Sequence, residues 1–327
     1  MKQKRLRKAG IILLVLTIVI TAIFIIPVLR HTAVVLVWGA IDKLEDSKAG
    51  KAVLPEGVAI IQDVPYIEDG IKEHMLDMYY PEAVSGQLPV IMFIHGGGFV
   101  SGDKKFVRQY CMTLADKGYI VFNVNYRLAP KYQSPAQIKD IIAALEWVEK
   151  NCSKYNGDPD AIVLAGNSAG AYLAGMAAVL CTNEGYAGEL ELEEPAVRNI
   201  DGVLLFSGVY DLKTGSRSGF PSIKSDIEML LGTINILDSA YADKLSVLNG
   251  INEDFPPAFI SSGEADWLHG ESAELTKLIN KMGIYHKSLL FDKSEKRAMH
   301  DYQFRLELDI SKQCLEEAVE FLGHVTK

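Results

Sequence analysis

Six short apolar runs, separated by stretches with helical spacing, constrain the fold of this 327-residue chain more than any other feature. Continuous apolar runs of this length are typical of strands buried on both faces of a parallel sheet. Their alternation with helices predicts an α/β fold with a mostly parallel, doubly wound sheet. The predicted strands are Leu88–Ile94, Tyr119–Val124, Ile162–Ala165, Gly202–Phe206, Ala258–Ser261 and Ser288–Phe291.

Apolar residues at helical intervals, and a small, apolar composition in residues 169–180, predict helices between most of these strands. Residues 58–64 and 73–80 are less regular, and we expect them to form an antiparallel edge of the sheet. Residues 212–255 contain no buried-strand run, which indicates a cap insertion over a site. The predicted helices are Pro135–Lys150, Ala169–Leu180, Glu271–Met282 and Ser311–Leu322.

The N-terminal 30 residues have a composition of their own. Residues Ala9–Leu29 form an uncharged run of 21 residues, long enough to cross a bilayer as a helix. A cleaved signal peptide usually has a shorter apolar core followed by a small-residue cleavage site, and none follows directly here. The sequence therefore favours an uncleaved transmembrane signal anchor over a cleaved signal peptide.

The charges that flank this apolar run predict its orientation. Five of the first eight residues are basic, whereas Arg30 is the one basic residue close to the other end. The positive-inside rule then keeps the N-terminus in the cytoplasm and exports the rest. We expect a single-pass cell-membrane protein, with a cytoplasmic flank and anchor in residues 1–30 and an extracytoplasmic main domain in residues 55–327.

Residues 31–54 are expected to form a juxtamembrane linker. Within them, Thr32–Leu44 is a mostly apolar stretch around Trp38. Such a stretch either lies at the membrane interface, with Trp38 as an anchor, or packs on the main domain. The sequence leaves both arrangements open.

Charge and cysteine content argue against two classes of function. Residues 31–327 hold 27 basic residues against 42 acidic ones, and a net charge of about −15 repels nucleic acid backbones. We therefore expect no nucleic-acid partner. The four cysteines lie far apart without the spacing of a metal site, so we expect free thiols, although export would permit one disulfide. No metal or cofactor is predicted.

A serine motif marks the junction between a predicted strand and a predicted helix. The residues Gly-Asn-Ser-Ala-Gly occupy positions 166–170, directly after strand Ile162–Ala165. A sharp strand-to-helix turn strains the serine backbone, needs small flanking residues and projects the hydroxyl above the sheet. The helix N-terminus also favours developing negative charge. This placement, more than the motif alone, makes Ser168 the predicted nucleophile.

A glycine loop, His-Gly-Gly-Gly-Phe at positions 95–99, follows strand Leu88–Ile94. Successive glycines allow backbone N–H groups to point into a cavity without a side chain in the way. The spacing of a phosphate-binding P-loop is absent. We therefore expect an oxyanion hole, with His95 as a structural residue that holds the loop.

A nucleophilic serine needs a base and an acid from neighbouring loops. Of the seven histidines, His300 lies after the last predicted strand, where a base can reach across the top of the sheet. Asp266 follows strand Ala258–Ser261 and is the leading acid; Glu264 and Asp292 are its rivals. The order Ser168, Asp266, His300 is the serine, acid, histidine order of one hydrolase class.

With these motifs, the sequence resembles the α/β-hydrolase superfamily, especially the hormone-sensitive-lipase-like esterases and carboxylesterases. The resemblance covers roughly residues 70–322 and includes Tyr-Arg-Leu-Ala-Pro at positions 126–130. It implies an α/β-hydrolase fold and a serine esterase that acts on small-molecule esters. It also implies the site: Ser168 as nucleophile, His300 as base, Asp266 as the acid that orients it, and Gly97, Gly98 and Ala169 as oxyanion donors.

The sequence departs from this family at a few positions. Asn167 replaces a common Asp, Ala171 a frequent Gly and Lys131 an acidic residue, and the segment around His300 lacks the usual glycine. Other functions of the same fold stay open: an amidase or peptidase, a membrane-tethered lipid hydrolase, or a binding module. Acyl length, natural substrate and oligomeric state are not determined by the sequence.

Overall fold

An eight-stranded sheet forms the centre of the computed structural model, which describes residues 21, 26–83 and 85–326. The strand order is β1-β2-β4-β3-β5-β6-β7-β8. Strand β2 is antiparallel to both β1 and β4, and the strands β4, β3, β5, β6, β7 and β8 run parallel to one another. The strands are β1 (Val58–Pro65), β2 (Met75–Pro81), β3 (Leu88–Ile94), β4 (Ile120–Val124), β5 (Gly157–Asn167), β6 (Gly202–Phe206), β7 (Ala258–Gly263) and β8 (His286–Phe291).

The predicted sheet is confirmed: all six apolar runs form parallel strands, and the two irregular stretches form the antiparallel edge. The largest difference concerns β5, predicted as four residues and observed as eleven. Its first half contains Asp158 and Asp160, which are not fully buried, so no apolar pattern indicates a strand there. The second half pairs with β3 on one side and β6 on the other, which explains its apolar character.

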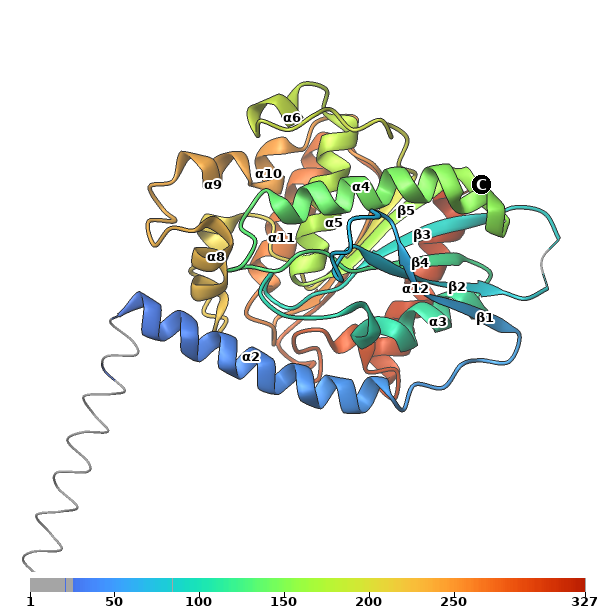
Figure 1. Cartoon of the computed structure of the whole chain (residues 1–327), viewed down its shortest axis with the longest axis horizontal. Coiled ribbons are helices and arrows are strands. Elements are labelled where there is room, and N and C mark those ends of the chain that lie inside the picture. Colours follow the sequence, from blue (N-terminus) through green and yellow to red (C-terminus); the bar gives the residue numbers. More distant parts are fainter. Residues whose placement is uncertain (1–20, 22–25, 84, 327) are drawn as a thin grey trace, which may run out of the picture.

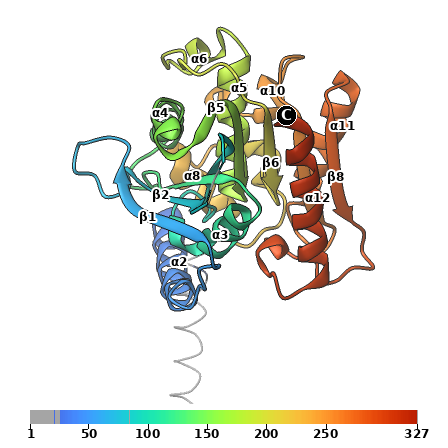
Figure 2. The ribbon, with the colours of Figure 1, turned by 90° about the vertical axis from the view of Figure 1, so that its right-hand side faces the viewer.

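Helices cover both faces of the sheet (Figures 1 and 2). The four predicted helices are present as α4, α5, α11 and α12. The α-helices are α2 (Pro27–Ala49), α3 (Arg108–Asp116), α4 (Ala136–Asn151), α5 (Ala169–Thr182), α6 (Tyr186–Glu189), α7 (Leu212–Gly215), α8 (Ile223–Leu231), α9 (Ala240–Lys244), α10 (Val247–Gly250), α11 (His269–Met282) and α12 (Asp309–Val325). Three 3-10 helices are η1 (Lys104–Val107), η2 (Cys152–Tyr155) and η3 (Tyr302–Phe304).

Alternation along the strands divides the core into two layers. In β3, Val90, Met92 and Ile94 belong to the layer with α4, α5 and α11, whereas Ile91 and Phe93 belong to the layer with α3 and α12. Successive side chains of a strand point to opposite faces, so a strand buried on both faces must be apolar throughout.

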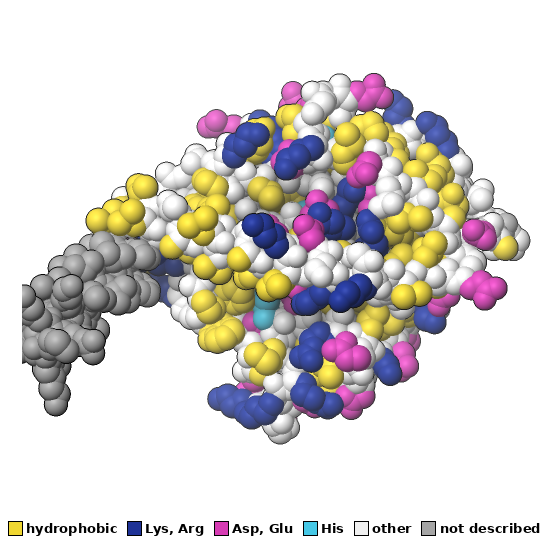
Figure 3. Space-filling view, turned by 60° about the horizontal axis from the view of Figure 1, so that its bottom comes forward, with side chains coloured by type: hydrophobic (Ala, Val, Ile, Leu, Met, Phe, Trp, Pro, Cys, Tyr) yellow, Lys and Arg dark blue, Asp and Glu magenta, His cyan; other side chains and the backbone are white. Residues whose placement is uncertain are grey.

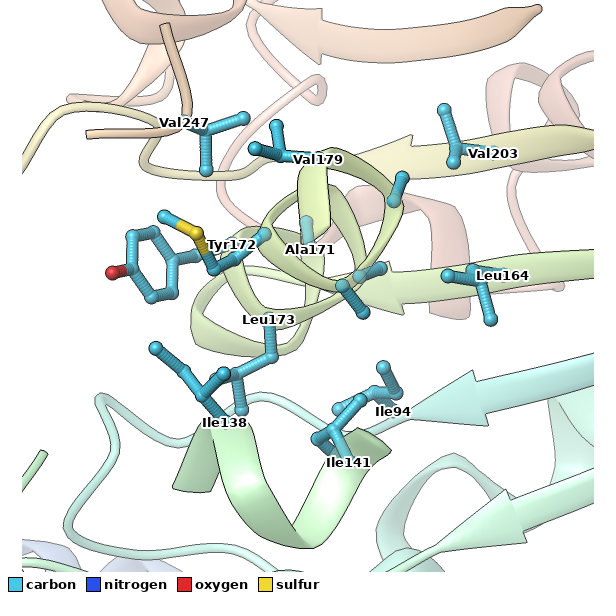
Figure 4. Close-up of a cluster of buried hydrophobic side chains, with 14 of the residues drawn as sticks. Ile94, Ile138, Ile141, Leu164, Ala171, Tyr172, Leu173, Val179, Val203 and Val247 are labelled. Carbon is cyan, nitrogen blue, oxygen red and sulfur yellow. The ribbon is translucent and has the colours of Figure 1, made fainter. Parts of the chain in front are cut away.

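Helix α5 is the most buried helix of the first layer. Its small residues, such as Ala171 and Ala174, allow close approach to the strands, and all but one of its residues are buried. In Figure 4 the strand residues Ile94 and Leu164 and the α4 residue Ile141 lie around α5. This packing fixes the start of α5, and therefore the residue that precedes it, against the sheet.

The segment predicted as a cap, residues 212–255, forms helices α7 to α10 and contains no strand. Its residues pack partly into the layer of α5: Val247 of α10 lies next to Gly175 of α5. Helix α8 stands apart from the sheet, beside α2 (Figure 1). The insertion therefore reaches from the core to the end of the sheet where the serine motif lies.

Helix α2 runs along the side of the domain on which α8 lies (Figure 1). Residues 31–54, expected as a linker, are therefore mostly helical. Of the two arrangements left open for Thr32–Leu44, the structure has α2 packed on the main domain through one face. Its polar contacts are Arg30 and His31 with Glu228, Trp38 with Asp226, Asp42 with Ser101, and Asp46 with Lys105.

The expected membrane anchor, residues 9–29, lies for the most part outside the described residues. Within the part that the structure describes, no helix combines the length and the apolar character that a membrane span requires. All four cysteines fall within the described residues, and each is a buried free thiol.

Candidate active site

The serine motif forms a tight turn between β5 and α5. Ser168 has φ 52° and ψ −119°, outside the regions that non-glycine residues ordinarily adopt. A Cβ on Gly166 would lie 2.4 Å from the backbone of Gly170, and a Cβ on Gly170 would lie 2.1 Å from the carbonyl oxygen of Ile94. Both flanking positions therefore require glycine. The turn places the Ser168 hydroxyl at the end of the sheet, where the loops after the other parallel strands converge.

Ser168, His300 and Asp266 lie together at this end of the sheet. The Ser168 hydroxyl is 3.0 Å from His300 Nε2. On the other edge of the ring, His300 Nδ1 is 2.9 Å from Asp266 Oδ2. In neutral histidine with the proton on Nδ1, Nδ1–H donates to the carboxylate and Nε2 accepts from the hydroxyl, as a general base for serine requires. The side chain of Asp266 is fully buried, and that of His300 is 17% exposed.

Asp266 is held by the loop between β7 and α11. Its second oxygen, Oδ1, accepts a hydrogen bond from the backbone N–H of Leu268 at 2.9 Å. The rival acids lie elsewhere: Glu264 Oε2 is 4.0 Å from Lys293 Nζ, and Asp292 accepts hydrogen bonds from Ser294. Of the three acids considered from the sequence, Asp266 is the one in contact with the histidine.

The electrostatic environment of His300 favours its protonated form. Burial by itself lowers the pKa of the imidazole, but the carboxylates of Asp301 and Asp266 outweigh it and raise the pKa to about 9. An imidazolium at this position is therefore stabilised. The ring of Phe220, from the insertion, packs edge-on against the imidazole with centroids 4.8 Å apart.

Of the predicted oxyanion donors, Gly97 lines the same pocket as Ser168, and Ala169 follows Ser168 directly in the chain. Gly97 and Gly98 adopt φ values of +124° and +61°, and Ala169 is the first residue of α5. Within the described residues, no hydrogen bond uses the N–H of Gly97, Gly98 or Ala169 as donor. Helix N-termini carry such unpaired donors and favour negative charge. These N–H groups are available to an oxyanion that forms beside Ser168.

His95 occupies a structural position in the glycine loop. Its ring is buried and stacks on Tyr126 with centroids 4.5 Å apart, and Nδ1 donates to the carbonyl oxygen of Gly96 at 2.7 Å. Burial lowers the pKa of His95, which favours the neutral ring. His269, the histidine nearest to the acid in sequence, pairs with Ser262 instead.

A pocket of about 700 Å³ opens onto Ser168 and His300. One side is formed by the glycine loop and the other by α2, which contributes Trp38, Ile41 and Asp42. No sequence motif predicts that α2 forms part of this pocket. The mostly apolar stretch around Trp38 is the one signal in the sequence that this segment packs on another surface. Among the residues that the structure describes, no cluster of three or more His, Cys, Asp or Glu side chains could hold a metal ion.

Comparison with known proteins places this chain in a family. The family model BD-FAE matches residues 76–277, well over half of the chain. This chain belongs to the BD-FAE family. The match begins in β2 and ends in α11, and it includes Ser168 and Asp266 but stops before His300.

Curated relatives of this BD-FAE chain include esterases of Mycobacterium tuberculosis. Esterase LipQ is 29% identical over 215 residues, which cover 62% of this chain and 48% of LipQ. Carboxylesterase NlhH is 28% identical over 259 residues, which cover 74% of this chain and 76% of NlhH. The probable carboxylic ester hydrolase LipM is 32% identical over 212 residues. The chain spans about half the length of LipQ and of LipM.

Among solved structures, esterase B from Lactobacillus rhamnosis superposes on the BD-FAE chain with a TM-score of 0.82 and 24% identity. The superposition covers 91% of this chain and 95% of esterase B. A bacterial heroin esterase superposes with a TM-score of 0.72 and 22% identity, over 89% and 91% of the two chains. The expected α/β-hydrolase fold is thereby confirmed.

Two residues near the triad of the BD-FAE chain had no role in the sequence prediction. Asn167 stands where the family motif commonly has Asp, and Asp301 follows His300 directly. In the structure they contact each other: Asn167 Nδ2 donates to Asp301 Oδ2 at 2.9 Å. No spacing rule connects positions 134 residues apart, so only the fold reveals this pair.

Proposed function

We propose that this protein is a serine hydrolase that cleaves carboxylic esters through an acyl-enzyme on Ser168. The observation that carries the proposal is the continuous contact from Ser168 Oγ through both ring nitrogens of His300 to the buried carboxylate of Asp266. Seven histidines and 42 acidic residues are available in the chain, yet this combination lies at the strained turn beside unpaired backbone donors. That arrangement has the parts of an acyl-transfer site.

Each residue has a defined step in this reaction. As Ser168 Oγ forms a bond to the ester carbonyl carbon, its proton passes to His300 Nε2. The carbonyl oxygen becomes an oxyanion and accepts hydrogen bonds from the N–H groups of Gly97, Gly98 and Ala169. When the C–O bond to the alcohol breaks, His300 returns its proton to the leaving oxygen. Water, activated by the same histidine, then releases the carboxylic acid and restores Ser168.

The relatives support an ester substrate. LipQ, LipM and NlhH carry esterase or carboxylic ester hydrolase names, and esterase B was solved with a tributyrin phosphonate inhibitor. A phosphonate resembles the tetrahedral intermediate of acyl transfer, so that complex fits a serine nucleophile in a protein of the same fold. We therefore propose small-molecule carboxylic esters as the substrate class, in preference to amides.

The test is hydrolysis of p-nitrophenyl acetate by the wild type and by Ser168→Ala. We expect Ser168→Ala to lose turnover and labelling by a fluorophosphonate probe, because the nucleophile is gone, while its thermal unfolding stays unchanged. Ser153→Ala, at an exposed serine of η2, is the matched control and should keep both activities. Turnover or labelling retained by Ser168→Ala would overturn the proposal.

Two substrate series refine the class. Faster turnover of the acetyl ester than of the matching anilide supports an esterase, whereas the reverse order supports the amidase or peptidase alternative. A profile of acyl chains from acetyl to palmitoyl distinguishes a hydrolase of small esters from a lipid hydrolase. The pocket beside Ser168 is bounded by α2, so the length at which turnover falls measures the space beneath that helix.

We further propose that residues 9–29 anchor the protein in the cell membrane, with the catalytic domain on the extracytoplasmic side. The long uncharged run and the basic residues before it support this orientation. Helix α2 begins at Pro27, within the last residues of this run, and several of its apolar side chains are exposed: Val28 is 71%, Leu36 70% and Leu44 65% exposed. In Figure 3, which turns the α2 side of the molecule forward, hydrophobic side chains are visible on this face.

The test of localisation is membrane fractionation followed by protease treatment of intact cells. We expect the protein in the membrane fraction, with the catalytic domain digested by protease added from outside. Recovery in the soluble fraction, or protection of the domain until the cells are opened, would contradict the proposed topology.

A further inference from the structure

Carboxylates lie on both edges of the catalytic histidine. Asp266 Oδ2 is 2.9 Å from His300 Nδ1, as the triad requires. On the opposite edge, Asp301 Oδ2 is 3.7 Å from Nε2, the nitrogen that is also 3.0 Å from Ser168 Oγ. Asp301 thus places a second negative charge beside the atom that takes the serine proton.

Asp301 is held in this position by Asn167. The Asn167 amide Nδ2 donates to Asp301 Oδ2 at 2.9 Å, while Asn167 Oδ1 accepts the backbone N–H of Gly96 at 3.0 Å. The asparagine therefore links the histidine loop, the nucleophile turn and the glycine loop. Asp301 itself adopts φ 56°, and its other oxygen, Oδ1, is buried without a hydrogen-bond partner among the described residues.

We propose that Asp301 is a positioning residue that, together with Asn167, sets the pH at which His300 acts as a base and ties the histidine loop to the oxyanion loop. This inference rests on the proposed function. The amide is suited to the role because it has both a donor and an acceptor. It gives the donor to Asp301 and uses the acceptor for Gly96, whereas a carboxylate at position 167 has no proton to give.

Charged groups from several elements face the same pocket, but few are near the imidazole. Asp42 and Glu45 of α2, Lys105 of η1 and Arg305 after η3 line its wall. The carboxylates that act on His300 are Asp301 and Asp266, which together raise its pKa to about 9 against the effect of burial. Of these two carboxylates, Asp266 belongs to the triad. Asp301 can therefore be substituted while all three triad residues are kept.

The sign of the pH effect follows from the state required for catalysis. The base must be neutral, and with its pKa raised to about 9 His300 is mostly protonated at neutral pH. We therefore expect kcat/KM of the wild type to rise with pH and to approach its plateau above about pH 9. Removing the Asp301 charge must move this rise to lower pH.

The experiment measures kcat/KM for p-nitrophenyl acetate from pH 5 to 10.5 with the full chain and four variants. Asp301→Asn removes the charge but keeps an acceptor for Asn167, so the rise should move down by about one pH unit or more, with about tenfold more neutral histidine at pH 7. Asp301→Ala should show the same shift and also a lower plateau kcat, because Asn167 then loses its partner. These two variants separate charge from loop positioning.

A reciprocal exchange tests the pairing itself. Asn167→Asp sets two carboxylates against each other, so we expect a lower plateau kcat and a rise at higher pH than in the wild type. The double variant Asn167→Asp with Asp301→Asn restores one donor and one acceptor and should recover most of the lost kcat. A profile of Asp301→Asn that superimposes on that of the wild type, or a double variant no better than Asn167→Asp, would overturn the proposal.

A second readout keeps this inference separate from the proposed function. Diethyl pyrocarbonate modifies neutral imidazole, so the pH dependence of His300 modification, followed by peptide mass spectrometry, reports the same proton without any ester. We expect its midpoint to fall in Asp301→Asn, with His269 as the internal reference. If the wild type neither hydrolyses esters nor reacts with a fluorophosphonate, the proposed function fails, and this midpoint still decides the role of Asp301.

Discussion

The indole nitrogen of Trp38 donates a hydrogen bond to Asp226 Oδ1 at 3.1 Å, and this contact joins helix α2 to helix α8 beside the glycine loop. A Cβ on Gly98 would lie 2.7 Å from Asp226 Oδ2 and 3.3 Å from the Trp38 ring. The segment that follows the apolar N-terminal run therefore touches the loop expected to hold the oxyanion. From the sequence alone, the stretch Thr32–Leu44 could equally lie at a membrane interface.

Trp38→Phe removes this hydrogen bond while keeping an aromatic ring. Asp226 Oδ2 already lacks a partner among the described residues, so the variant leaves a buried carboxyl with one polar contact fewer. We expect a loss of about 1–3 kcal/mol in the free energy of unfolding, measured by denaturant titration. Trp267→Phe, at a half-exposed indole, is the control and should change stability much less.

Asp226 should make stability depend on pH in a defined window. Burial raises its pKa to about 7, so between about pH 4 and pH 7 the folded protein keeps a proton that the unfolded chain has released. Stability from this group is therefore complete at low pH and is lost as pH rises through that window. Asp226→Asn carries no such proton. The difference in unfolding free energy between variant and wild type should move in favour of the variant from pH 4 to 7 and then level off; a constant difference would contradict the assignment.

Asp266→Asn tests the choice of acid. The substitution preserves the shape of the side chain but removes the charge that favours the imidazolium and selects its tautomer. We expect kcat for p-nitrophenyl acetate to fall by about 10³–10⁴-fold with thermal unfolding little changed. Glu264→Gln changes the rival acid two residues earlier and should leave kcat close to that of the wild type. The opposite ranking would transfer the role to Glu264.

Gly97→Ala tests the glycine loop. A Cβ at this position would lie 2.1 Å from the carbonyl oxygen of Ser101, so the loop must move and its N–H groups with it. Loss of an oxyanion donor reduces kcat by about 10²–10³-fold. Gly118→Ala is the matched control: this glycine also has a positive φ, +95°, but nothing lies within 4 Å of a Cβ there. Gly118→Ala should lower the free energy of unfolding by about 1–2 kcal/mol through backbone strain and leave kcat unchanged.

Much of the fold was predictable because buried strands leave a local signature. Leu88–Ile94 and Gly202–Phe206 are apolar throughout since both faces of a parallel sheet are covered. The polar first half of β5 leaves no such signature, because its side chains are partly exposed and form no apolar pattern. The nucleophile turn was visible in the sequence because its geometry restricts consecutive residues to small types.

The sequence by itself determined the order of strands and helices, the position of Ser168 at a strand-to-helix junction, and the small set of acids and histidines able to serve it. These follow from periodicity and from steric limits on neighbouring residues. Tertiary structure alone decided that Asp266 contacts His300, that α2 forms a wall of the pocket, and that Asn167 meets Asp301. Such contacts join residues 34 to 188 positions apart, and they depend on how loops converge at one end of the sheet, which no local pattern encodes.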